Sequence, residues 1–181
     1  MQAARGASLN PSADAHPDSR AGDPRYRLVF VGVFLVAYAI DVVSKMVAVD
    51  RLTGRADIEL VGEWFQLHLT RNPGAAFSTA ESLTPVLSLL AVAAAVTVVW
   101  FARRLGTTSW AISLGLLLAG ITGNLTDRIL RDPGPLHGHV VDFFMVPNWP
   151  VFNVADICIN VGAALILINT VRGVSLDGSR A

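Results

Sequence analysis

The stretch from residue 84 to residue 101 reads TPVLSLLAVAAAVTVVWF and carries no charged side chain. A helix needs about 20 mostly apolar residues to cross the ~30 Å hydrocarbon core of a bilayer, and this stretch approaches that length. Three further apolar segments of similar length flank it, at residues 28–49, 109–130 and 151–171. The sequence therefore predicts an all-α integral membrane protein, built as a four-transmembrane-helix bundle.

The composition also indicates a membrane setting. Apolar residues make up 52% of the 181 residues and charged residues only 15%, whereas ordinary soluble domains carry about 25% charged residues. This difference argues against a soluble enzyme. With a formal net charge of 0, the chain lacks the excess of basic residues that is typical of nucleic-acid-binding proteins. The single cysteine, Cys158, excludes an intrachain disulfide and a multi-cysteine zinc site.

Basic residues in short loops set the orientation of the spans, because they favour the cytoplasmic side. The loop at residues 102–108 holds Arg103 and Arg104 without an acid. We therefore expect a multi-pass protein of the inner (cytoplasmic) membrane, with this loop and both termini in the cytoplasm. The expected organisation is a disordered cytoplasmic tail at residues 1–24, a membrane domain at residues 25–172 and a second cytoplasmic tail at residues 173–181.

The outer segment at residues 50–80 differs from the spans. Residues 65–70 read FQLHLT and alternate between apolar and polar side chains, which is the period of a strand. Residues 56–61 are the expected partner strand, with a turn at residues 62–63, and the N-P-G at residues 72–74 ends the second strand. The sequence thus predicts a small extracytoplasmic β element between the first two helices.

Polar side chains of the spans gather at one depth. In three of the four helices, charged or amide residues fall in the half nearer the outer face, namely Asp41, Lys45, Asn124, Asp127, Arg128, Asn153 and Asp156. Charges inside a bilayer are costly and mark function by default. The alternative is structural: Asp41–Lys45, in the favourable i,i+4 order, and Asp127–Arg128 only hold the bundle together. Gly120 and Gly123 allow a second helix to approach closely.

Asp142 and Asp156 are the candidates for acid–base chemistry. Asp142 is flanked by Val-Val and Phe-Phe, an unusual setting for a solvated carboxylate, and the P-N-W-P at residues 147–150 can return the chain toward Asp156. Two carboxylates in one site cannot both ionise easily, so one holds a proton near neutral pH. Metal-free activation of water requires such a pair. For Asp156 a structural alternative remains, because Asn153 and Asp156 have the spacing of a capping box.

The sequence shows no set of ligands for a catalytic metal. His137 and His139 lack the partner residues of a metal-binding motif and are interpreted as loop residues. We therefore expect neither a metal nor another cofactor.

Four stretches, taken in order, resemble the lipoprotein signal peptidases, the signal peptidase II family of bacterial aspartyl peptidases, over about residues 28–172. They are DVVSK at 41–45, NPGAAFS at 72–78, GNLTDR at 123–128, and VDF at 141–143 with FNVAD at 152–156. The chain departs from the family in its longer N-terminal tail and in Ala119, where glycine is common. Asn160 has no family counterpart.

The resemblance implies an endopeptidase that removes signal peptides from prolipoproteins, cutting before a diacylglyceryl-modified cysteine, with membrane lipid around the site. It implies that Asp142 and Asp156 are the catalytic dyad. The outer β element would match the family's extracytoplasmic cradle. It also implies that Asn72, Asn124, Arg128 and Asn153 line or brace the site. We expect the same of Gly74, Phe77, Asp127, Asp41 and Lys45.

The motif at residues 72–78 has its own expectations. Gly74 is expected to permit a backbone conformation or a close approach that a side chain would block, and Phe77 to dip toward the membrane interface. Asn72 offers amide donors and an acceptor to the substrate or to a neighbour of the dyad. The alternative is a plain turn, since Asn, Pro and Gly are common turn residues.

Two other classes of function compete with the peptidase. A small transporter or proton channel would use Asp41, Lys45, Asp127 and Arg128 as a relay, but the inner halves of the four spans carry no charge and Asp142 would have no role. A non-enzymatic assembly protein is the third possibility, and it would tolerate Asp→Asn changes at 142 and 156.

Overall fold

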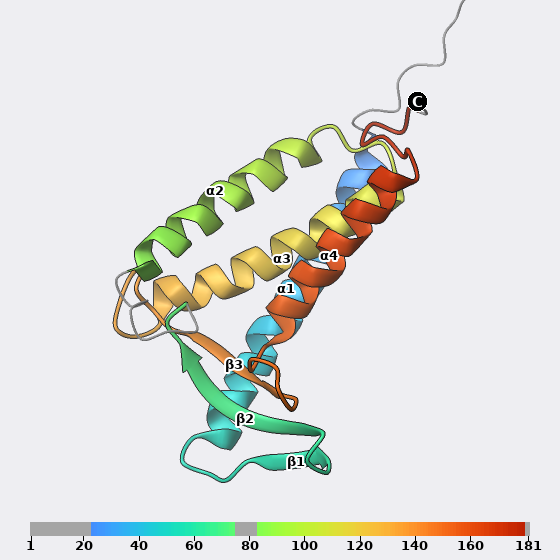
Figure 1. Cartoon of the computed structure of the whole chain (residues 1–181). Helices are drawn as coiled ribbons and strands as arrows, with labels where there is room; N and C mark the ends of the chain where they lie inside the picture. The colour runs from blue at the N-terminus through green and yellow to red at the C-terminus, as the bar shows by residue number, and fades with distance from the viewer. Residues whose placement is uncertain (1–22, 75–82, 180–181) are drawn as a thin grey trace, which may run out of the picture.

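The computed structural model describes residues 23–74 and 83–179. Within these ranges it contains four helices that are long and apolar enough to cross a membrane (Figure 1). They are α1 (Pro24–Leu52), α2 (Thr84–Ala102), α3 (Thr108–Leu130) and α4 (Val154–Val171). The prediction of a four-helix membrane bundle is confirmed.

Local sequence explains where three of the helices begin. The Asp23 side chain accepts a hydrogen bond from the backbone N–H of Arg25, and Pro24 occupies the first turn of α1. The Thr107 hydroxyl caps α3 in the same way. Asn153 caps α4 as part of a full capping box with Asp156. These caps satisfy N–H groups that the first turn of a helix leaves without partners.

Helix α3 lies between α1, α2 and α4 and is the most buried of the four. Two of its glycines explain the close packing. A Cβ on Gly123 would collide with the Asp41 carboxylate of α1, and a Cβ on Gly120 would collide with the backbone oxygen of Ala155 in α4. Small residues at helix contacts allow such approach in membrane bundles, so the prediction for Gly120 and Gly123 is confirmed.

The β element is larger than predicted. Strands β1 (Ile58–Val61) and β2 (Phe65–Asn72) form the expected antiparallel pair, but a third strand, β3 (Val140–Met145), pairs with the other edge of β2. It comes from the segment between α3 and α4, so the sheet is not confined to the stretch between the first two helices. The sequence of β3, VVDFFM, lacks the alternation that marks a strand.

The register of β2 and β3 decides where the site lies. Thr70 is opposite Asp142, and Asn72 is opposite Val140. Asn72 is the last residue of β2, so the strand ends at the N-P-G of residues 72–74, as predicted. The third strand brings Asp142 beside the end of β2.

The two ends of the bundle differ (Figure 1). The sheet lies at one end, with the last turns of α1 and α3 and the first turns of α2 and α4. At the opposite end the chain after α4 packs against the start of α3. There the backbone N–H of Gly106 donates to the Leu176 oxygen at 2.9 Å, and the indole N–H of Trp110 donates to the Val174 oxygen at 2.7 Å.

Candidate active site

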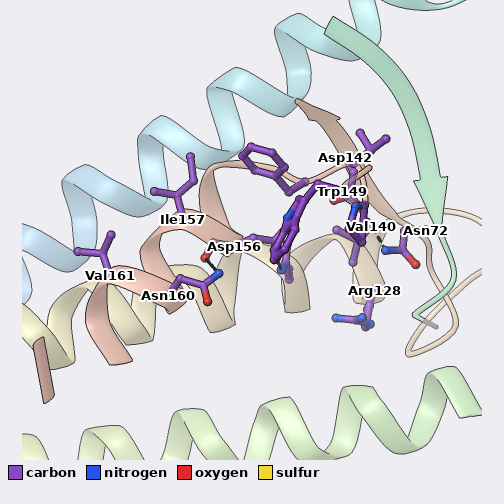
Figure 2. Close-up of a pocket in the computed structure, with 13 residues that line it drawn as sticks. Asn72, Arg128, Val140, Asp142, Trp149, Asp156, Ile157, Asn160 and Val161 are labelled. Atoms are coloured by element: carbon purple, nitrogen blue, oxygen red, sulfur yellow. Dashed lines mark hydrogen bonds between the residues drawn. The ribbon is translucent and has the colours of Figure 1, made fainter. Parts of the chain in front are cut away.

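A cavity of about 490 Å³ opens at the sheet end of the bundle (Figure 2). Its walls come from the end of β2, the last turns of α3, strand β3, the loop before α4 and the first two turns of α4. The lining residues are Asn72, Asn124, Arg128, Val140, Asp142, Trp149, Pro150, Val151, Phe152, Asp156, Ile157, Asn160 and Val161. Residues widely separated in the sequence therefore meet around one space, and both candidate carboxylates are among them.

Strand β3 presents Asp142, whose side chain is only 2% exposed. Its Oδ1 accepts a hydrogen bond from Asn153 Nδ2 at 2.6 Å, and its Oδ2 accepts one from Asn72 Nδ2 at 3.0 Å. Burial raises the pKa of Asp142 from 3.8 to about 6; the amide of Asn72 opposes the rise and the charge of Asp156 adds to it. Asp142 thus holds a proton more readily than an ordinary aspartate.

Asp156 lies in the first turn of α4. Its backbone N–H donates to Asn153 Oδ1 at 2.9 Å, and its Oδ2 accepts from the backbone N–H of Asn153 at 3.1 Å, which completes the capping box. The other oxygen, Oδ1, accepts from Asn124 Nδ2 at 2.8 Å. The structural alternative for Asp156 is therefore confirmed, and the same side chain also lines the cavity.

Asn153 connects the two aspartates. It is fully buried, and while its oxygen caps α4 its Nδ2 donates to Asp142. The same nitrogen lies 3.1 Å from Asn124 Oδ1 and 3.3 Å from the backbone oxygen of Val141. Because this one amide contacts both sides of the pair, it fixes the position of Asp142 relative to the start of α4.

Beneath the cavity, Lys45 of α1 is 1% exposed and has three acceptors. Its Nζ lies 2.9 Å from Asp41 Oδ2, 3.0 Å from Asp127 Oδ2 and 2.9 Å from Asn124 Oδ1. The expected Asp41–Lys45 pair is confirmed. The expected Asp127–Arg128 pair is wrong, because Asp127 pairs instead with Lys45 and with Arg131, one turn further along α3.

The two acids paired with Lys45 also hold the backbone next to the candidate dyad. Asp41 Oδ1 accepts from the N–H of Ala155 at 2.8 Å, directly before Asp156. Asp127 Oδ2 accepts from the N–H of Val141 at 3.2 Å, directly before Asp142. One buried cation, Lys45, therefore joins the two carboxylates that hold the backbone next to Asp142 and Asp156.

Arg128 and Gly74 lie together at the β2 side of the cavity. Arg128 lines the cavity, and its Nε is buried without a hydrogen-bond partner among the described residues. Gly74 has φ of +117°, and a Cβ there would lie 2.7 Å from Leu87 Cδ1 and 3.4 Å from Arg128 Nη2. Both expectations for Gly74, an unusual backbone conformation and a close approach, are confirmed.

Asn72 makes one contact that is typical of a turn and one contact with Asp142. Its Oδ1 accepts from the backbone N–H of Gly74 at 2.8 Å, as in an Asx turn, while its Nδ2 donates to Asp142. Phe77 lies outside the described residues.

Several residues stand apart from the cavity or were missed in the sequence. His137 and His139 line a different cavity, and Cys158 is buried between helices. Trp149 and Asn160 line the site without having been predicted. Asn160 could have been found, because it follows Asp156 by four residues in an otherwise apolar stretch.

Among residues 23–74 and 83–179, no group of three or more His, Cys, Asp or Glu side chains is arranged to hold a metal ion.

Known proteins of similar fold include two solved structures described as bacterial membrane enzymes. One has a TM-score of 0.68 at 24% identity, covering 88% of this chain and 95% of that chain. The other has a TM-score of 0.69 at 23% identity, covering 87% and 99%. At this level of identity the likeness establishes the fold alone.

Sequence comparison establishes more than the fold. A family model described as signal peptidase (SPase) II matches residues 33–172. Proteins named lipoprotein signal peptidase are similar to this chain in Mycolicibacterium smegmatis (44% identity, covering 92% of this chain and 72% of the relative) and in Streptomyces griseus (43%, covering 93% and 85%). In Mycobacterium tuberculosis the figures are 44%, 94% and 84%. With this family match over most of its length and the four-helix membrane fold around the cavity, the chain belongs to the signal peptidase II family.

Proposed function

We propose that the protein is an aspartic endopeptidase that removes signal peptides from prolipoproteins, cutting before a diacylglyceryl-modified cysteine. One observation carries the catalytic assignment. Asp142 and Asp156 line the same cavity, and the Asn153 side chain hydrogen-bonds to both residues. Family membership supports the substrate class, since the relatives are named lipoprotein signal peptidases.

The proposed reaction assigns different tasks to the two aspartates. Asp156, as carboxylate, takes a proton from a water molecule, whose oxygen attacks the scissile carbonyl carbon. Asp142, protonated, gives its proton to the carbonyl oxygen, and a tetrahedral gem-diol forms. The diol then returns a proton to Asp142, the C–N bond breaks, and the proton held by Asp156 passes to the leaving amine.

The neighbouring side chains position this pair. Asn72 and Asn153 donate to Asp142, and Asn124 donates to Asp156, so each carboxylate has a fixed orientation. Arg128 lines the cavity, and we assign its guanidinium to a carbonyl oxygen of the substrate backbone. Asp41, Lys45 and Asp127 act as positioning residues below the site.

The surroundings suit a lipid-bearing substrate. Ile157 and Val161 line the cavity on α4 and are each 43% exposed, which gives acyl chains an apolar wall. The cavity lies at the sheet end of the bundle (Figure 1), and we expect water to reach it there, at the membrane–water boundary. We place this end at the outer face of the cytoplasmic membrane and both termini in the cytoplasm, with residues 25–172 as the peptidase domain between tails at 1–24 and 173–181.

The transporter alternative gains no support from the arrangement of charges. Lys45, Asp41, Asp127 and Arg131 form one cluster at the sheet end of the bundle. A relay that carries protons or ions across the membrane needs groups along the whole path. A cluster confined to one depth is suited to positioning a site.

Cleavage of a diacylglyceryl-modified prolipoprotein peptide by the purified protein tests the proposal. Asp142→Asn and Asp156→Asn should each lower turnover by at least about 10²-fold, because each removes a proton-transfer group. Both variants should still insert and fold. Asp50→Asn is the matched control, since Asp50 is 77% exposed and outside the cavity, and it should cleave normally. A chelator should change nothing. Near-normal turnover by either dyad variant would overturn the aspartic mechanism.

A further inference from the structure

Asn160 is a polar residue in an unusual place. It lines the cavity on α4, one turn beyond Asp156, and between Ile157 and Ile168 it is the only residue with an amide side chain. Its side chain is exposed on the same face as Ile157 and Val161, a face that meets lipid or substrate. Polar side chains on such faces are costly and rare unless they have a partner.

The hydrogen bonds of Asn160 leave part of its side chain available. Its Nδ2 donates to the backbone oxygen of Asp156 at 2.9 Å, and this is the one side-chain hydrogen bond that Asn160 makes with the described residues (Figure 2). A side-chain amide has two N–H donors and a carbonyl acceptor. One N–H and the carbonyl oxygen therefore remain for a ligand in the cavity.

Depth in the helix indicates which part of a substrate meets this amide. Asn160 lies about 6 Å further along α4 than Asp156, at 1.5 Å per residue. In the proposed reaction the peptide bond lies at Asp156 and the acyl chains lie along Ile157 and Val161. The ester groups of a diacylglyceryl cysteine connect the glyceryl carbons to the acyl chains, and Asn160 lies within this wall, between Ile157 and Val161. An ester carbonyl can only accept a hydrogen bond, which matches the unused N–H.

We propose that Asn160 donates this N–H to an ester carbonyl of the diacylglyceryl group, and so acts as a specificity-determining residue for the acylated cysteine. This inference rests on the proposed function. It adds a role for a residue outside the dyad and outside the motifs that identify the family.

Two matched peptide substrates test the inference, one with a diacylglyceryl cysteine and one with a dialkylglyceryl cysteine of the same chain length, which lacks the ester carbonyls. The wild-type protein should prefer the ester by roughly two- to tenfold in kcat/KM, the range expected for one hydrogen bond. Asn160→Leu keeps a similar shape and suits an apolar face. It should lose most of this preference, because kcat/KM for the ester falls while that for the ether is unchanged.

The control is Val161→Ala, which changes the same wall without changing its polar groups and should affect both substrates equally. An Asn160→Leu variant that lowers kcat/KM for both substrates by the same factor, or that retains the preference for the ester, would overturn the inference. A wild-type protein that cleaves neither lipidated peptide would overturn the proposed function as well, so the two failures are distinguishable.

Discussion

Asp142 and Asp156 differ in what their oxygens accept. Asp142 is buried on β3. Among the described residues its carboxylate accepts hydrogen bonds from the neutral amides of Asn72 and Asn153, and burial raises its pKa to about 6. Asp156 accepts a backbone N–H at the start of α4, where the helix dipole favours negative charge. This contrast supports Asp142 as the protonated member of the proposed dyad.

The pH dependence of cleavage follows from that assignment. We expect kcat/KM to fall about tenfold per pH unit as the pH rises above about 6, because Asp142 loses the proton that the reaction needs. The corresponding fall in kcat should begin at a higher pH. A bound lipid excludes water from the cavity and so favours the neutral form of Asp142. The measurement is a pH–rate profile with a diacylated peptide. A rate that still rises between pH 6 and 8 would contradict the assignment.

Among the elements, α1 supports the candidate site through Lys45 and Asp41. Lys45→Met should lower the free energy of unfolding by about 3–5 kcal/mol, because it leaves the buried carboxylates of Asp41 and Asp127 without their cation. The measurement is thermal or denaturant unfolding in detergent. Asp41→Asn and Asp127→Asn added to Lys45→Met should recover part of the loss by removing the unpaired charges.

The matched control is an ion pair of the same helix in a different environment. Arg51 and Asp50 lie 3.3 Å apart but are 70% and 77% exposed. Arg51→Gln should therefore change stability by at most about 1 kcal/mol. If Lys45→Met were no more destabilising than Arg51→Gln, the role of Lys45 in joining the two acids would be wrong.

What the sequence predicted at this scale depended on local spacing. The four helices, the Asp41–Lys45 pair and the Asn153–Asp156 capping box involve residues within a few turns of one another. Strand β3 could not be predicted, because its apolar run lacks alternation and its pairing with β2 joins distant segments. The bridging amide of Asn153 could not be predicted either, since it depends on how β3 and α4 meet.

For the whole molecule, the orientation in the membrane remains a prediction. Single cysteines at Glu63, in the β1–β2 turn, and at Thr108, at the start of α3, are exposed positions at opposite ends of the bundle. In intact cells a membrane-impermeant thiol reagent should label Glu63→Cys and not Thr108→Cys. The basic loop before α3 favours the cytoplasm, which is the physical reason for this outcome.

Two controls make the labelling interpretable. Permeabilised cells should label both variants, and the protein with Cys158 alone should stay unlabelled because that thiol is buried. Labelling of Thr108→Cys alone in intact cells would invert the topology and put the cavity on the cytoplasmic side.

The contacts of Lys45 and Asp41 can form only in a set order while the chain is being translated. Of the described helices, α1 leaves the ribosome first, and until α3 follows, Lys45 has only Asp41 as a charged partner. Asp41 in turn gains the N–H of Ala155 only when α4, the last of these helices, is inserted. The two aspartates are therefore brought together only when nearly the whole chain has been translated. A nascent or prematurely terminated chain lacks an assembled site and cannot act as a stray protease in the membrane.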